Sequence, residues 1–202
     1  MSASSHAPDL PAEIRRTLLL AGPLIIGQVT GYAMTVVDTL MAGRLGALDL
    51  GAVAVGSSIW TAGMVFIVGM LMAVSAAVSQ LEGAGQRRQA GELTRQALWL
   101  ALLVSLLLFW LMRRGGWVMS AIGVEPAVGE LANRYLLAIS WGMPALAGMT
   151  ALRFFSEGIG YTRPTMYIGV AGIVFNVPLN YTLMFGKLGM PALGAEGCGW
   201  AT

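Results

Sequence analysis

The sequence has few of the residues from which most enzyme and metal sites are built. It contains one cysteine, Cys198, and one histidine, His6. A single cysteine excludes an intramolecular disulfide and a cysteine-based zinc site. His6 lies in a polar N-terminal tail, where we expect it to be solvated, and the sequence holds no H-x-x-x-H motif and no serine–histidine arrangement. These absences argue against an enzyme and against a resident metal.

Charge is also scarce, because only 11% of residues are charged and 56% are hydrophobic, against about 25% charged residues in a soluble domain. A helix that spans a bilayer needs about 17–25 predominantly apolar residues. We therefore predict an all-α membrane protein, a polytopic bundle of five complete transmembrane helices, with a sixth starting near Gly197. We expect a fragment of a longer polypeptide, with a polar tail over 1–13 and the bundle over 14–202. The uncharged windows are Thr17–Val37, Leu50–Leu81, Gln96–Met112, Tyr135–Leu152 and Pro164–Gly186.

Basic residues between the windows indicate an orientation, because lysine and arginine are enriched in cytoplasmic loops. They are slightly more numerous in the N-terminal tail and the second and fourth loops than on the opposite side. This predicts a cytoplasmic N-terminus, with Asp38 toward the outer end of the first helix, and it explains the basic pI without nucleic-acid binding. The first group is Arg15, Arg16, Arg87, Arg88, Arg95, Arg153 and Arg163, and the second is Arg44, Arg113, Arg114, Arg134 and Lys187.

One carboxylate, Asp38, follows the otherwise uncharged first window. A carboxylate inside a spanning helix costs about 2.5–3.5 kcal/mol on insertion scales, so a retained one usually has a function. Gln28 and Thr35 fall on one face of this helix, which we expect to look inward, and together with Tyr32 they are our candidates for lining a substrate cavity. Pro23 is expected to bend the helix, because proline removes a backbone hydrogen bond and clashes with the preceding turn.

The last window carries Asn176 and Asn180, four residues apart and hence on one helical face. Pro178 lies between them, and we expect it to bend this helix as Pro23 bends the first. Buried amides need hydrogen-bond partners. Asp38 can accept hydrogen bonds from both asparagine amides. Thr202, or a backbone carbonyl freed by Pro178, can complete an oxygen-lined pocket. Such a pocket suits a proton on Asp38, or Na⁺ held by Asp38, Asn176 and Asn180. The alternative is that the asparagines only join helices, each stabilising the packing by about 0.6 kcal/mol.

The pattern Glu-Gly-x-Gly occurs three times, and we predict that each copy forms a turn between helices. A phosphate-binding interpretation needs a strand–loop–helix context, which is missing here. The three copies are Glu82–Gly85, Glu157–Gly160 and Glu196–Gly199.

Taken in order, several segments resemble the N-terminal half of the multidrug and toxic compound extrusion (MATE) family, in its bacterial NorM-like branch. Their order and spacing together carry the resemblance, which runs from about Ile14 to Thr202. The segments are Gly22-Pro23, Val37–Gly43, Ala52–Trp60, Gln80–Gly85, Gly158–Pro164, Asn176–Asn180 and Leu193–Thr202.

The resemblance implies a twelve-helix exporter of organic cations, built from two six-helix bundles and driven by inward Na⁺ or H⁺, with no cofactor. It implies a multi-pass protein of the inner membrane whose second bundle is missing from this chain. By matching positions, Asp38, Asn176, Asn180 and Thr202 fall on the family's cation or proton site, and Pro23 on the bend of the first helix. Some relatives have a second carboxylate where this chain has Asn180.

Two other functions stay open from the sequence. A lipid-linked oligosaccharide flippase of related architecture would need a more basic cavity, whereas we expect these helices to hold no buried lysine or arginine. A non-transporting membrane scaffold would use Asp38 and the two asparagines only as contacts between helices.

Overall fold

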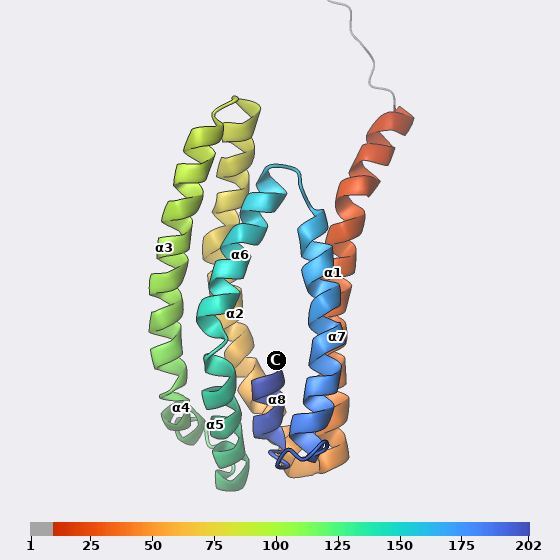
Figure 1. Cartoon of the computed structure of the whole chain (residues 1–202). Helices are drawn as coiled ribbons and strands as arrows, with labels where there is room; N and C mark the ends of the chain where they lie inside the picture. The colour runs from red at the N-terminus through yellow and green to blue at the C-terminus, as the bar shows by residue number, and fades with distance from the viewer. Residues whose placement is uncertain (1–9) are drawn as a thin grey trace, which may run out of the picture.

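The structure is a computed structural model that describes residues 10–202, except for the side chains of residues 10–13 and 16. The predicted polar tail, 1–13, and His6 therefore lie largely outside the described residues. The described chain folds into α-helices joined by short turns (Figure 1). The helices are α1 (Leu10–Leu45), α2 (Ala47–Gly83), α3 (Arg87–Met112), α4 (Gly115–Ala121), α5 (Pro126–Ser140), α6 (Met143–Gly158), α7 (Arg163–Phe185) and α8 (Ala195–Ala201).

Four of these helices, α1, α2, α3 and α7, are long and apolar enough to cross a membrane, and α5 with α6 adds a fifth span if the bent pair is counted as one. This confirms the predicted polytopic bundle. The α2 helix has 37 residues, about 55 Å at 1.5 Å per residue, so it is longer than the roughly 30 Å hydrocarbon core.

The span predicted over Tyr135–Leu152 consists of two helices and not one, because α5 and α6 meet at a 51° bend around Trp141 and Gly142. Pro144 lies in the first turn of α6. It has no backbone N–H, and in a continuous helix its ring would clash with the carbonyl of Ser140. The chain therefore ends one helix and starts another at this point.

Figure 1 shows two groups of helices that diverge toward one end of the molecule. In one group α1 runs along α7, and in the other α2 packs with α3, α5 and α6. The N-terminal end of α1 and the α2–α3 and α6–α7 turns lie at the open end, and the short α8 lies between the groups near the other end. This arrangement places the N-terminal end of α1 and the second and fourth loops on one side, as predicted from the sequence.

Glycines allow the closest helix contacts. A Cβ atom on Gly56 of α2 would lie 2.4 Å from the ring of Tyr135 on α5, and one on Gly169 of α7 would lie 2.5 Å from the Thr30 hydroxyl on α1. Within the Gly27-x-x-x-Gly31 motif, Gly27 packs against α7 while Gly31 has open space around its Cα. Small residues at these positions let the backbones approach closely.

Candidate functional site

The fold brings together Asp38, Asn176, Asn180 and Thr202, which lie on three different helices or their ends. Asp38 is 7% exposed, Asn176 is 2% exposed and Asn180 is fully buried. Asp38 comes from α1, the two asparagines lie on one face of α7 on either side of Pro178, and Thr202 follows the last residue of α8. The four-residue spacing thus places both asparagines on one helical face, as predicted from the sequence.

Hydrogen bonds connect the four side chains. Asn180 Nδ2 donates to Asp38 Oδ1 at 2.5 Å and to Asn176 Oδ1 at 3.0 Å. The Thr202 hydroxyl lies 3.3 Å from Asp38 Oδ2, and Asn176 Nδ2 lies 3.5 Å from Thr202 Oγ1. Both oxygens of the carboxylate thus face neutral donors.

The Thr202 hydroxyl has two acceptors for one proton. Besides Asp38 Oδ2 it lies 3.0 Å from the carbonyl oxygen of Cys198. A hydroxyl donates only one hydrogen bond, so donation to Cys198 leaves Asp38 Oδ2 free to accept a proton or a cation.

A further oxygen, Asn180 Oδ1, is buried and has no hydrogen-bond partner among the described residues. An unpartnered buried polar atom costs about 1–3 kcal/mol. Oxygen ligands are those that hard cations prefer. The carboxylate of Asp38 and the Thr202 hydroxyl are oxygen groups of this kind, whereas Asn180 presents its Nδ2, and not this oxygen, to Asp38.

No positive side chain neutralises Asp38, since none of the ion pairs among the described side chains includes it. The described residues also contain no cluster of three or more histidine, cysteine, aspartate or glutamate side chains that could hold a metal ion. A buried carboxylate without a cationic partner is favoured in its neutral or cation-bound form.

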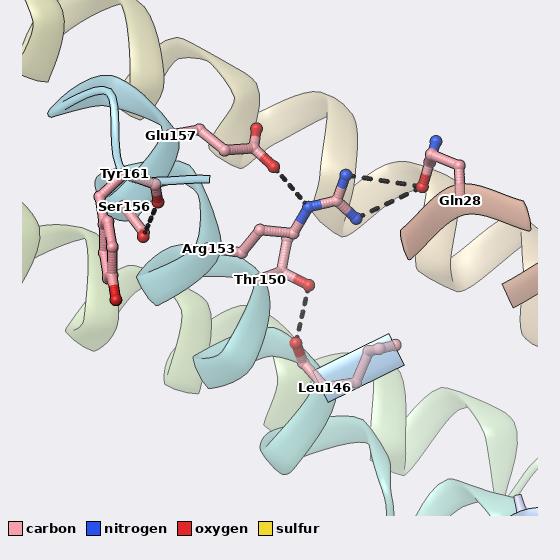
Figure 2. Close-up of polar contacts among 7 residues, drawn as sticks. All are labelled: Gln28, Leu146, Thr150, Arg153, Ser156, Glu157 and Tyr161. Carbon is pink, nitrogen blue, oxygen red and sulfur yellow. Dashed lines mark hydrogen bonds and ion pairs between the residues drawn. The ribbon is translucent and has the colours of Figure 1, made fainter. Parts of the chain in front are cut away.

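The proposed cavity-lining residues lie apart from this cluster. Tyr32 is 73% exposed, and the Thr35 hydroxyl bonds the backbone carbonyl of Gly31 within its own helix. Gln28 is also exposed, and its side-chain oxygen lies 3.5 Å from both terminal nitrogens of Arg153 on α6 (Figure 2). Their role in binding a substrate stays a prediction.

Arg153 corrects one expectation, because we counted it as a loop residue, whereas the expectation that the helices hold no buried lysine or arginine agrees with the described residues. Arg153 lies inside α6, its side chain is only 32% exposed, and its Nε donates to Glu157 Oε1 at 2.7 Å (Figure 2). Sequence reasoning placed the end of this helix too early, at Leu152. Because Glu157 balances the charge of Arg153, this part of the bundle is not basic.

The third Glu-Gly-x-Gly copy was expected to be a turn at Glu196–Gly199, and that expectation is wrong. These residues lie inside α8. The helix expected to start near Gly197 is present as α8 and starts two residues earlier, at Ala195. Gly197 and Gly199 let it approach its neighbours closely, because both lie against neighbouring backbone.

Comparisons with known proteins identify the family. A sequence model of the MatE family matches residues 23–182. The multidrug resistance protein PmpM of Pseudomonas aeruginosa is 43% identical over 209 residues, which cover 98% of this chain and 43% of that protein. The multidrug resistance protein MdtK of Yersinia pestis is 43% identical over 191 residues, covering 94% of this chain and 42% of that protein. The chain thus spans less than half the length of these relatives.

Solved structures share the fold. An outward-facing multidrug resistance MATE family transporter of the MOP superfamily superposes with a TM-score of 0.83 at 21% identity, over 93% of this chain and 41% of that one. The eukaryotic MATE transporter AtDTX14 gives a TM-score of 0.84 at 24% identity, over 94% of this chain and 43% of that one. With the matching family model and the 43% identical relatives, these findings establish that the chain belongs to the multidrug and toxic compound extrusion (MATE) family of membrane transporters.

Proposed function

We propose that this chain is the N-terminal bundle of a multidrug efflux antiporter that exports organic cations in exchange for Na⁺ or H⁺. Residues 14–202 would form the bundle, 1–13 its polar tail, and a second bundle of the same transporter would complete the cavity. The names of the 43% identical relatives, both multidrug resistance proteins, support the efflux function. We place the protein in the inner membrane with its N-terminus in the cytoplasm, in keeping with the distribution of basic residues.

The observation that supports ion coupling is the buried Asp38, whose carboxylate faces only neutral side chains, the amide group of Asn180 and the hydroxyl of Thr202. Antiport requires that cargo and coupling ion favour opposite conformations, because a ligand without such a preference shifts no equilibrium. In our proposal ionised Asp38 favours the drug-bound state. Binding of a proton or Na⁺ neutralises it, α1 bends at Pro23, and the drug is released outward.

The test is efflux of a fluorescent organic cation from vesicles that contain the chain together with its second bundle. Asp38→Asn preserves the size of the side chain but removes its charge, so we expect loss of ion-driven efflux with normal membrane insertion. Ser105→Ala is a matched control, because Ser105 is equally buried within α3 but bonds only the carbonyl of Leu102. Efflux at the unmodified rate in Asp38→Asn would remove Asp38 from the mechanism.

The same assay separates the two other functions. A lipid-linked oligosaccharide flippase and a non-transporting scaffold both predict no exchange of an organic cation for Na⁺ or H⁺. Linkage adds a second requirement, because bound drug must weaken binding of the coupling ion by the same factor by which the ion weakens drug binding. Independent binding of the two ligands would contradict antiport through this site.

A further inference from the structure

A second carboxylate, Asp49, holds the start of α8 from another helix. Asp49 lies in the first turn of α2, and its Oδ1 accepts a hydrogen bond of 2.8 Å from the backbone N–H of Ala195, the first residue of α8. The preceding residue, Gly194, provides no side-chain cap. The first N–H groups of a helix have no partner within the helix. Asp49 therefore supplies from α2 an acceptor that α8 does not provide for itself.

The backbone at this contact is shaped to fit the carboxylate. Gly194 has φ 58° and ψ −133°, a conformation that favours glycine, and a Cβ atom there would lie 2.7 Å from Asp49 Oδ1. The backbone N–H groups of Leu193 and Gly194 bond the carbonyl oxygens of Leu183 and Met184 at the end of α7. The start of α8 is thus fixed between α7 and the Asp49 side chain.

Two other faces of α8 are in backbone contact with neighbouring helices. A Cβ atom on Gly197 would lie 2.7 Å from the carbonyl group of Leu183 on α7, and one on Gly199 would lie 2.6 Å from the carbonyl oxygen of Tyr135 on α5. Toward α2, the bond that Ala195 N–H donates to Asp49 is the one hydrogen bond between α8 and a side chain of α2 among the described residues. The contacts with α5 and α7 restrain α8 on two sides, and the hydrogen bond to Asp49 restrains it on the side of α2.

The position of α8 matters because Thr202 follows its residue Ala201. Thr202 comes seven residues after Ala195, about 10 Å at 1.5 Å per residue, so a tilt of about 6° at Ala195 moves Thr202 by about 1 Å. The Thr202 hydroxyl lies 3.3 Å from Asp38 Oδ2, which is already near the limit of a hydrogen bond. A shift of that size away from Asp38 would break the contact.

We propose that Asp49 is a positioning residue for the coupling site, holding α8 so that the Thr202 hydroxyl reaches Asp38. The inference rests on the proposed function of the Asp38 cluster and adds to it a residue outside that cluster. Asp49 acts as a hydrogen-bond acceptor and not through its charge, because its partner is a neutral backbone N–H. An amide in its place keeps the acceptor, while an aliphatic side chain of similar shape removes it.

The transport test compares Asp49→Asn with Asp49→Leu in the transporter with both bundles. Loss of one hydrogen bond at Thr202 is expected to raise the half-saturating concentration of the coupling cation about three- to tenfold in Asp49→Leu, with the maximal rate retained. Asp49→Asn should behave as the unmodified protein. Thr202→Val should reproduce the rise, and the Asp49→Leu/Thr202→Val double variant should show no further increase, because both changes remove the same contact.

A second measurement follows α8 directly through Cys198, which is buried in the middle of this helix. We expect maleimide to label Cys198 about three- to tenfold faster in Asp49→Leu than in Asp49→Asn. Mass spectrometry of the peptide that contains Cys198 gives the rate without measuring transport. If Asp49→Leu does not accumulate in the membrane, Asp49→Ser is the substitute. The serine oxygen is one bond closer to the backbone and does not reach Ala195 N–H, so the cation dependence and the Cys198 labelling rate should change in the same direction as in Asp49→Leu.

The results separate this inference from the proposed function. Equal Cys198 labelling in Asp49→Leu and Asp49→Asn, additive effects with Thr202→Val, or failure of Asp49→Asn to restore the cation dependence would each overturn the positioning role. If Asp38 is not the coupling site, Asp38→Asn and Thr202→Val leave transport unchanged, while the contrast in Cys198 labelling persists.

Discussion

A second carboxylate in place of Asn180 provides a direct measure of the geometry around Asp38. Asn180 Nδ2 lies 2.5 Å from Asp38 Oδ1, so in Asn180→Asp two carboxylate oxygens face each other. If they relax to about 3 Å, the repulsion between two full charges is about 5–6 kcal/mol at an effective dielectric constant of about 20. Because 1.36 kcal/mol corresponds to a factor of ten, the doubly ionised pair is disfavoured about ten-thousandfold.

The factor by which repulsion disfavours the doubly ionised pair is larger than the factor by which an ordinary aspartic acid favours ionisation at pH 7. A solvated aspartic acid favours its ionised form about a thousandfold at pH 7. We therefore expect the pair of carboxyl groups in the Asn180→Asp variant to retain one proton at pH 7. Infrared difference spectroscopy of the purified protein measures it as a protonated carboxyl C=O band that disappears when the pH is raised well above 7.

The control exchanges the two side chains. The Asp38→Asn/Asn180→Asp double variant keeps one carboxylate beside one amide, so repulsion is absent and the band should be smaller at the same pH. A band of equal size in this double variant would show that burial alone retains the proton. Absence of the band from Asn180→Asp at pH 7 would mean that the two side chains are not neighbours, and the reasoning about the site would be refuted.

Two further predictions concern packing between helices. Gly56→Ala places a Cβ atom 2.4 Å from the ring of the buried Tyr135, so it should lower the free energy of unfolding in detergent by about 1–3 kcal/mol, whereas Gly69→Ala, which meets open space, should not lower it. Gln28→Glu gives Arg153 a charged partner on α1 and should stabilise the protein by about 0.2–1 kcal/mol in thermal unfolding at low salt. That gain should shrink at high salt, while a gain of the same size in Gln28→Leu would argue against the contact.

Much of the fold follows from the sequence because charged residues are rare and separate long apolar windows. Those windows gave five spans and their alternating sides. The bend between α5 and α6 was missed, although Gly142 and Pro144 mark it, because uncharged length alone does not distinguish one helix from two. The helix ends were also placed too early, as Arg153 shows, because a charged side chain can continue a helix when a partner such as Glu157 lies one turn away.

The site was predictable to the extent that it depends on local spacing. Asn176 and Asn180 share a face because they are four residues apart, and Asp38 was conspicuous as a charge in an apolar helix. The resemblance supplied Thr202. Nothing local predicts the contact between Asp49 and Ala195, because the two residues are 146 positions apart and a carboxylate in the first turn of a helix is common in itself.

Asp38 and Asp49 show why the chemistry of an acidic residue depends on the partner the fold gives it. Asp38 faces an amide and a hydroxyl on side chains, and the hydroxyl has a second acceptor in the carbonyl of Cys198, so its hydrogen bond can be exchanged for a proton or a cation. Asp49 faces a backbone N–H, which cannot rotate away without moving α8 itself. The first arrangement suits a residue whose charge state changes during a cycle. The arrangement around Asp49 suits a residue that keeps α8 in place while the charge of Asp38 changes.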